Sequence, residues 1–169
     1  MSDAQELSMV SRETFYDTFT GTCAPEDMEA FLDAHFNLEQ VKGELSNKED
    51  FFYLAEMPSG IAGYTRYMED YKNFPMMKEW KALELKRLYV KKEFKGKGVA
   101  QLLMDHVLQY ATENNYEVVW LGVWEHNRRA TRFYEKCGFV KSGYMHDFPI
   151  GKSPQIDHWM WKFLDRTPA

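Results

Sequence analysis

The stretch that decides the fold is Leu88–Ala111, LYVKKEFKGKGVAQLLMDHVLQYA. An apolar strand end leads into a short basic turn with two glycines, Gly96 and Gly98, and the turn opens an amphipathic helix. Glycine lets the backbone pass close to a ligand without interference from a side chain, and the first amide groups of a helix have no partner within the helix. A strand, a glycine turn and a helix N-terminus in this order predict an anion site suited to phosphates.

Two other phosphate-binding motifs are excluded by single positions. The dinucleotide motif G-x-G-x-x-G requires a third glycine where Gln101 stands, and a Walker loop requires Gly-Lys-Ser/Thr, which is absent. What remains is a phosphate site surrounded by lysines, or a basic turn that is simply solvated. The lysines are Lys91, Lys92, Lys95 and Lys97.

Length and composition indicate one globular domain over residues 1–169. The chain has 44% hydrophobic and 16% aromatic residues, which excludes a disordered protein. Two cysteines, Cys23 and Cys137, are too few for a disulfide framework and are typical of a reducing compartment. No apolar run approaches about 18 residues and no signal-like segment is present. We therefore expect a cytoplasmic protein that does not span a membrane.

The net charge of −5 hides an asymmetry between the two parts of the chain. Residues 1–60 carry 13 acidic and 3 basic side chains, whereas residues 61–169 carry 13 acidic and 18 basic ones. The overall negative charge argues against nucleic acid as the main partner. An acidic part beside a basic part fits a protein that binds one cationic and one anionic ligand, although solvated acidic helices would give the same counts.

Periodicity and turn residues divide the chain into helices, a hairpin, a strand-helix-strand unit, a helix and a second hairpin. The predicted elements are helices 4–18, 25–36 and 38–45, strands 51–57 and 61–70, a loop 71–81, a strand 83–92, the helix after the glycine turn, a strand 116–124, a helix 128–137, and strands 139–148 and 156–164. The apolar residues of strand 83–92 change phase, which indicates either noise or a β-bulge near Lys86-Arg87. VVWLGVW within 116–124 is apolar on both faces, as in a buried parallel strand. The class is mixed α/β.

The second informative stretch is Trp124–Phe139, WEHNRRATRFYEKCGF. Asn127, Ala130 and Tyr134 fall on one side of the predicted helix, which alone indicates no more than an N-cap and core packing. Combined with the basic-Gly-basic-Gly-x-Ala turn, however, the pattern Asn-x-x-Ala-x-x-Phe-Tyr-Glu-Lys-x-Gly-Phe resembles the GCN5-related N-acetyltransferases (GNAT superfamily) over residues 5–164. Within that superfamily WLGVWEHN, ELKRLYV and HDFPIGKSPQIDHWM are most similar to the PaiA-type spermidine/spermine N-acetyltransferases.

The resemblance implies a GNAT fold, in which a mostly antiparallel sheet contains one parallel pair of strands that splay apart and bind acetyl-CoA. Here these are the strand that ends at Val90 and the strand at 121–124. The peptide groups of Leu88, Tyr89 and Val90 would pair with the pantetheine arm, Asn127 would bond to the pantetheine or diphosphate, and Lys136 would contact the ribose phosphate. The diphosphate would bind to the amides of Lys95, Gly96, Lys97, Gly98, Val99 and Ala100. No metal is expected.

The same resemblance implies direct attack of a primary amine on the thioester. Since the ordinary pKa of such an amine is about 10.4, only about one amine in a few thousand is neutral at pH 7, so a base must take its proton. We expect Glu84 or an ordered water chain in this role, a strand amide near Tyr89 as the stabiliser of the oxyanion, and Tyr134 as the general acid for the departing thiolate.

The acceptor is the least determined part of this prediction. The first two helices and the final hairpin would form its pocket, and the acidic first part of the chain favours a cation such as spermidine or spermine. Acetylation of a protein lysine or N-terminus, or of a small aminated antibiotic, and a catalytically idle acetyl-CoA-binding regulator are the alternatives. Family members usually begin with a short strand that residues 1–4 do not offer, so the sheet lacks an edge strand or a partner supplies it in a homodimer.

Overall fold

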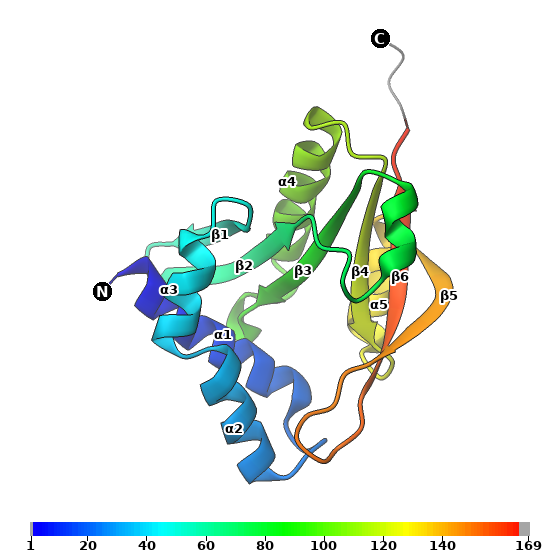
Figure 1. Ribbon diagram of the computed structural model, residues 1–169. Helices are drawn as coiled ribbons and strands as arrows, with labels where there is room; N and C mark the ends of the chain where they lie inside the picture. Colours follow the sequence, from blue (N-terminus) through cyan, green and yellow to red (C-terminus); the bar gives the residue numbers. More distant parts are fainter. Residues whose placement is uncertain (1, 166–169) are drawn as a thin grey trace.

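A six-stranded sheet in the order β1-β2-β3-β4-β6-β5 forms the centre of the molecule, in a computed structural model that describes residues 2–165 (Figure 1). The strands are β1 Phe51–Met57, β2 Gly60–Met68, β3 Ala82–Val90, β4 Val118–Trp124, β5 Val140–Asp147 and β6 Ile156–Phe163. β3 and β4 are parallel, and every other neighbouring pair is antiparallel. The mixed, mostly antiparallel sheet is therefore confirmed.

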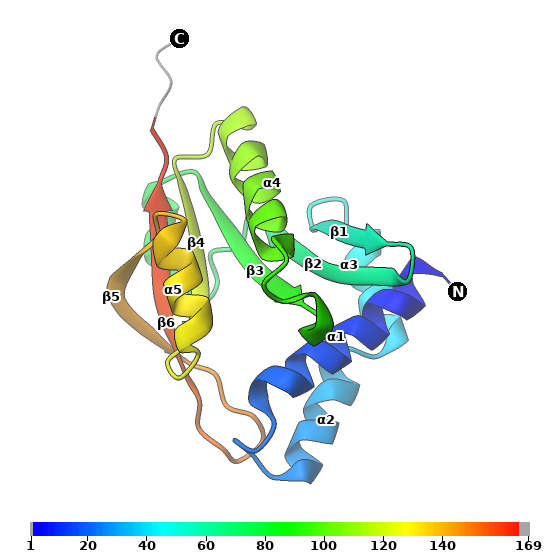
Figure 2. The ribbon, with the colours of Figure 1, turned by 180° about the vertical axis from the view of Figure 1, so that it is seen from behind.

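Helices cover both faces of the sheet (Figures 1 and 2). They are α1 Asp3–Phe19, α2 Pro25–His35, α3 Leu38–Ser46, α4 Val99–Glu113 and α5 Arg128–Lys136, with short 3-10 helices η1 Pro75–Glu79 and η2 Lys92–Phe94. On one face Tyr64 of β2 packs against Leu7 of α1 and Val41 of α3. On the other face Leu83 and Leu85 of β3 pack against α4. No helix of residues 2–165 is long and apolar enough to cross a membrane.

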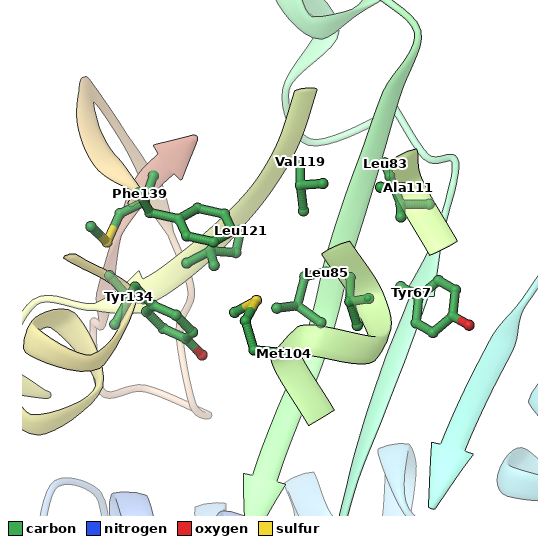
Figure 3. Close-up of a cluster of buried hydrophobic side chains, with 12 residues drawn as sticks. Tyr67, Leu83, Leu85, Met104, Ala111, Val119, Leu121, Tyr134 and Phe139 are labelled. Carbon is green, nitrogen blue, oxygen red and sulfur yellow. The ribbon is translucent and has the colours of Figure 1, made fainter. Parts of the chain in front are cut away.

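The main core lies between the sheet, α4 and α5 (Figure 3). Met104 and Val107 of α4 meet Leu121 and Val123 of β4 there, and all four are nearly inaccessible to water. Burial of an aliphatic side chain of this size contributes about 1.5–3 kcal/mol relative to exposure. This core fixes the helix that follows the glycine turn against the two parallel strands.

Of the two explanations for the change of phase near Lys86-Arg87, noise or a β-bulge, the structure shows the bulge. Arg66 of β2 pairs with Arg87 while the next residue, Tyr67, pairs with Leu85, so Lys86 has no opposite residue. This extra residue explains the change of phase, because Leu83 and Leu85 before it and Leu88 after it all pack on the α4 side.

The loop 71–81 differs from the expected pattern, whereas the start of the chain agrees with it. The segment 71–81, predicted to be a loop, contains η1, where Phe74 and Met77 pack against Trp120. A five-residue helix is too short to show a hydrophobic period, which is why the pattern did not indicate η1.

Among the described residues no strand precedes α1, so β1 is an edge of the sheet, as expected; Met1 itself lies outside them.

Candidate active site in the β3–β4 split

β3 and β4 run together for only half of their length and then separate (Figure 1). Their parallel pairing extends from Ala82–Val118 to Leu85–Leu121 and stops just before the bulge at Lys86. A cleft of about 920 Å³ opens in the split. Its walls come from β3, β4, the turn before α4, α5, the first two helices and the β5–β6 connection, so segments far apart in sequence meet around one space.

The β3 side of the split lies beyond the last β3–β4 pair at Leu85–Leu121. The Lys91 N–H donates to the Ala62 carbonyl at 2.9 Å, within the antiparallel β2–β3 register. Peptide groups alternate in direction along a strand, so those of Tyr89 also face β2, whereas those of Leu88 and Val90 face the cleft. The amide of Tyr89 itself is therefore turned away from the cleft, and the amides near it that face the cleft are those of Leu88 and Val90.

The glycine turn lies at one end of the cleft with its backbone exposed. Gly96 and Gly98 have φ values of 77° and 83°, the left-handed region that side chains disfavour. Gly98 is the N-cap of α4, and no side chain caps this helix. A Cβ added to either glycine would meet nothing within 4 Å, so the space over the turn is free. Uncapped amides beside free space fit an anionic ligand.

The basic residues of the turn differ in their position. Lys95, Val99 and Ala100 line the cleft with the two glycines. Lys97 is exposed outside this lining, with Nζ 5.7 Å from the centroid of the Phe94 ring. Positive charge therefore gathers at the end of the cleft where the amides are free.

Asn127 begins α5 directly after β4. Its side-chain oxygen accepts a hydrogen bond from the Ala130 N–H at 3.1 Å, and its own N–H donates to the Trp124 carbonyl at 2.9 Å. Arg129, in the first turn of the helix, lines the cleft, whereas Lys136 in the last turn is exposed outside the lining. Sequence reasoning missed Arg129, since a basic residue in a helix with several others carries no distinct signal.

Tyr134 extends from α5 toward the split, with its ring in the cluster around Met104 and Leu121 (Figure 3). The side chain is 8% exposed. Burial, and then the neighbouring Cys137 and Asp157, raises the pKa of this phenol above its ordinary value. The hydroxyl is thus protonated at neutral pH, as a general acid requires.

Two carboxylates lie deep in the cleft. Glu84 is 7% exposed, and its pKa is raised to about 7 by burial, with Lys86 opposing and Asp70 assisting the shift. The second is Asp157 on β6, whose pKa burial raises to about 6. Sequence reasoning missed Asp157, because a single acid in an aromatic strand reads as an ordinary exposed position. Two acids with raised pKa values in one cleft are typical of sites that move protons.

Part of the cleft is an aromatic chamber formed by α1, α2 and the β5–β6 connection. Phe15, Phe19, Phe31 and Phe148 pack around it, with Phe15 and Phe31 stacked at 4.6 Å. The β5–β6 connection is held in place from α2, where Asp27 accepts from the Lys152 N–H at 3.2 Å. Aromatic residues of the first two helices therefore line the cleft, and their role in an acceptor pocket stays a prediction.

No acidic residue of the first two helices lines the chamber. Two acids of the first sixty residues instead serve the fold: Glu44 binds Arg87 at 2.8 and 3.0 Å, and Asp50 binds Arg66 at 2.6 Å. The excess of acidic residues in the first sixty positions therefore includes acids of buried ion pairs as well as acids on solvated helices. The acids that do line the cleft are Glu84, Asp147 and Asp157, all from later strands.

The comparisons with known proteins agree with this arrangement. The Acetyltransferase (GNAT) family model matches residues 12–139. An uncharacterised N-acetyltransferase of Lactobacillus delbrueckii subsp. lactis is 34% identical over 163 residues, which are 96% of this chain and 92% of the relative. One from Mycobacterium tuberculosis is 31% identical over 97% of this chain and 99% of the relative. The chain therefore belongs to the GNAT family and is an N-acetyltransferase.

The solved structures give the same fold. The PaiA N-acetyltransferase from Thermoplasma acidophilum, crystallised in complex with coenzyme A, superposes with a TM-score of 0.74 at 22% identity over 96% of this chain and 93% of that chain. Sequence identity at this level supports the fold alone. Among residues 2–165 no group of three or more His, Cys, Asp and Glu side chains is arranged to hold a metal ion.

Proposed function

We propose that this acetyltransferase transfers the acetyl group of acetyl-CoA to a primary amine by direct attack, and that the amine is a polyamine such as spermidine or spermine. The observation that carries the proposal is the split between β3 and β4. Its lining includes the uncapped start of α4, the aromatic chamber and the buried phenol of Tyr134.

The residues of the split fit the donor. The peptide groups of Leu88 and Val90 offer an extended edge to the amides of pantetheine, as an added strand would use it. The open amides at the start of α4 suit the diphosphate. Asn127 contributes its side-chain amide, and Lys95 and Arg129 supply positive charge for the phosphates from the lining. Lys97 and Lys136, exposed outside the lining, would have to reach the phosphates from the surface.

The chemistry asks for a neutral amine, a stabilised oxyanion and a departing thiol. The amine nitrogen attacks the thioester carbon, and the carbonyl oxygen gains charge close to the amide of Leu88 or Val90. The carbon–sulfur bond then breaks, and Tyr134 gives its proton to the sulfur while the new amide nitrogen loses one. Because a thiolate leaves readily, most of the acceleration comes from holding amine and thioester together.

The chamber fits a long cation with apolar segments. Methylene groups of a polyamine would lie against the rings of Phe15, Phe19 and Phe31, and an ammonium group is attracted both by ring faces and by carboxylates. Glu84 and Asp147 line the same space as Asp157. The three acids therefore suit the ammonium groups of spermidine, and the aromatic rings suit its methylene groups.

A polyamine panel tests the proposal. Free thiol is followed with acetyl-CoA and spermidine, spermine, a lysine peptide, a peptide with a free N-terminus and an aminated antibiotic. We expect thiol release and acetylated product with the polyamines at a higher kcat/KM than with the peptides. A preference for a peptide would move the acceptor to a protein amine, and tight acetyl-CoA binding without turnover would make the chain a regulator.

The proposal also covers the compartment and the oligomeric state of the protein. We infer one N-acetyltransferase domain over residues 1–169 in the cytoplasm, because Cys23 and Cys137 are both free thiols. The open β1 edge would be completed in a homodimer. Size-exclusion chromatography with light scattering decides between monomer and dimer.

A further inference from the structure

We propose that Asp157 is the catalytic base of this acetyl transfer: its carboxylate binds the acceptor ammonium and removes the proton before attack. The inference rests on the proposed function and adds a residue to it. Three observations support it, namely the place of the side chain in the split, its lack of a partner, and the groups around it.

Asp157 lies where β3 and β4 have already separated. It pairs across the sheet with Trp124 of β4 and His146 of β5. Its Oδ2 would stand 3.0 Å from a Cβ placed on Gly122, so the carboxylate lies over the β4 backbone just beyond the last parallel pair at Leu121. Glycine at 122 leaves room for the ring of Trp159, whose Cζ3 would stand 2.5 Å from that Cβ, and for this carboxylate beside it.

The carboxylate has no hydrogen bond or ion pair to any residue of 2–165, although it is partly buried. A buried carboxylate without a partner is costly for a protein, and a positively charged ligand removes that cost. The pKa of about 6 that burial gives Asp157 leaves it ionised at pH 7 and able to accept a proton.

Glu84, the base expected from the sequence, has a different environment. It forms an ion pair with Lys86 at 3.5 Å, and Lys86 is also bound to Asp70 at 2.8 Å. It pairs with Trp120, where β3 and β4 are still hydrogen-bonded, so it lies at the closed root of the split. This position suits Glu84 to the distal ammonium of a long acceptor better than to the amine that reacts.

The groups that face Asp157 come from three elements. The charge of Asp157 contributes to the raised pKa values of Tyr89 on β3 and Tyr134 on α5, which places both phenols near it, whereas Glu84 is not among the charges that affect Tyr134. His146 on β5 is opposite Asp157, with its ring 4.9 Å from that of Trp159. Tyr134 on α5 and Asp157 on β6 thus line one cleft from different elements, as a separate acid and base would.

The proton balance is complete with these residues. The ammonium gives one proton to the Asp157 carboxylate, and the neutral amine attacks the thioester carbon. The sulfur leaves with the proton of Tyr134, and the tyrosinate takes the proton that the new amide nitrogen loses. Asp157 then releases its proton to water, so each turnover yields one acetylated amine, one thiol and one proton.

The test is the pH profile of kcat/KM with spermidine for the wild-type chain, Asp157→Asn, Asp157→Glu and Glu84→Gln. We expect a wild-type rate that falls on the acid side of about pH 6. In Asp157→Asn this limb is lost and kcat/KM at pH 7 falls by about 10²-fold or more, while the affinity for coenzyme A is unchanged. Asp157→Glu keeps an acid limb at reduced rate. Glu84→Gln raises KM for spermidine and keeps the limb.

Coenzyme A affinity by calorimetry and the circular dichroism spectrum check that each variant is folded. A wild-type limb retained in Asp157→Asn, or lost only in Glu84→Gln, overturns the assignment while the proposed function stands. A wild-type chain that turns over no amine at all overturns the proposed function, and the base with it.

Discussion

Replacing Gly98 by alanine separates the conformational role of the glycine turn from its role in binding the donor. Gly98 has φ +83°, and a left-handed conformation costs a residue with a Cβ about 1–2 kcal/mol. No atom lies within 4 Å of the added Cβ, so no clash increases this cost. For a chain of this size the melting temperature should fall by about 2–8 °C.

Donor binding should fall by a larger factor. The methyl group that Gly98→Ala adds would occupy the free space over the turn, where the diphosphate must approach the α4 amides. Loss of one hydrogen bond to a charged group costs about 1.5–3 kcal/mol, equivalent to roughly a 10- to 150-fold weaker Kd for coenzyme A. Isothermal titration calorimetry measures this Kd, and urea unfolding measures the change in stability.

Gly21 supplies a matched control. It has φ +82°, has no atom within 4 Å of an added Cβ, and lies exposed between α1 and α2, outside the cleft lining. Gly21→Ala should therefore lose the same stability as Gly98→Ala and keep the wild-type Kd. Equal coenzyme A affinities for the two variants would refute the assignment of the turn as the diphosphate site.

Two further variants test the acid and the buried ion pairs. Tyr134→Phe keeps the packed ring, so kcat should fall by about 10²-fold without a change in coenzyme A affinity or melting temperature, and an unchanged kcat would exclude the acid role. The second variant concerns Glu44. Burial alone would raise the pKa of its carboxyl group, but Arg87 and Arg66 hold this pKa below its ordinary value of 4.5. This pairing stabilises the fold above about pH 4.5 and is lost as the pH falls through the lower folded-state pKa. Glu44→Gln should lose about 2–4 kcal/mol at pH 7 and show a flatter decline below pH 4.5 in urea unfolding; an equal decline would contradict the pairing.

Local patterns were sufficient for the elements whose structure is decided by neighbours in sequence. The glycine turn and α4 were predictable because the backbone has a positive φ at Gly96 and Gly98, which favours glycine. The start of α5 was predictable because Asn127 caps it. The bulge at Lys86 left a change of phase in the sequence, which noise could also have produced. For the same reason the family resemblance, which rests on these two local motifs, identified the fold correctly.

Features that depend on pairing between distant strands were not predictable. Asp157 enters the split only because β6 lies beside β4 and Gly122 leaves space over that strand. The acids Glu44 and Asp50 look like part of an acidic surface in the sequence, yet they are buried against Arg66 and Arg87. Net charge per segment carries no information about which charges meet in three dimensions, so the residues that line the aromatic chamber could be identified only in the structure.

The initial-rate pattern with acetyl-CoA and spermidine tests the central claim most directly. Direct attack in the split requires donor and amine to be bound together, so double-reciprocal plots at several fixed spermidine concentrations should give intersecting lines. Each thiol released should be matched by one acetylated spermidine in the mass spectrum. Parallel lines would indicate an acetylated enzyme intermediate, and thiol release without acetylated amine would indicate hydrolysis. Either result would contradict direct transfer between the two strands.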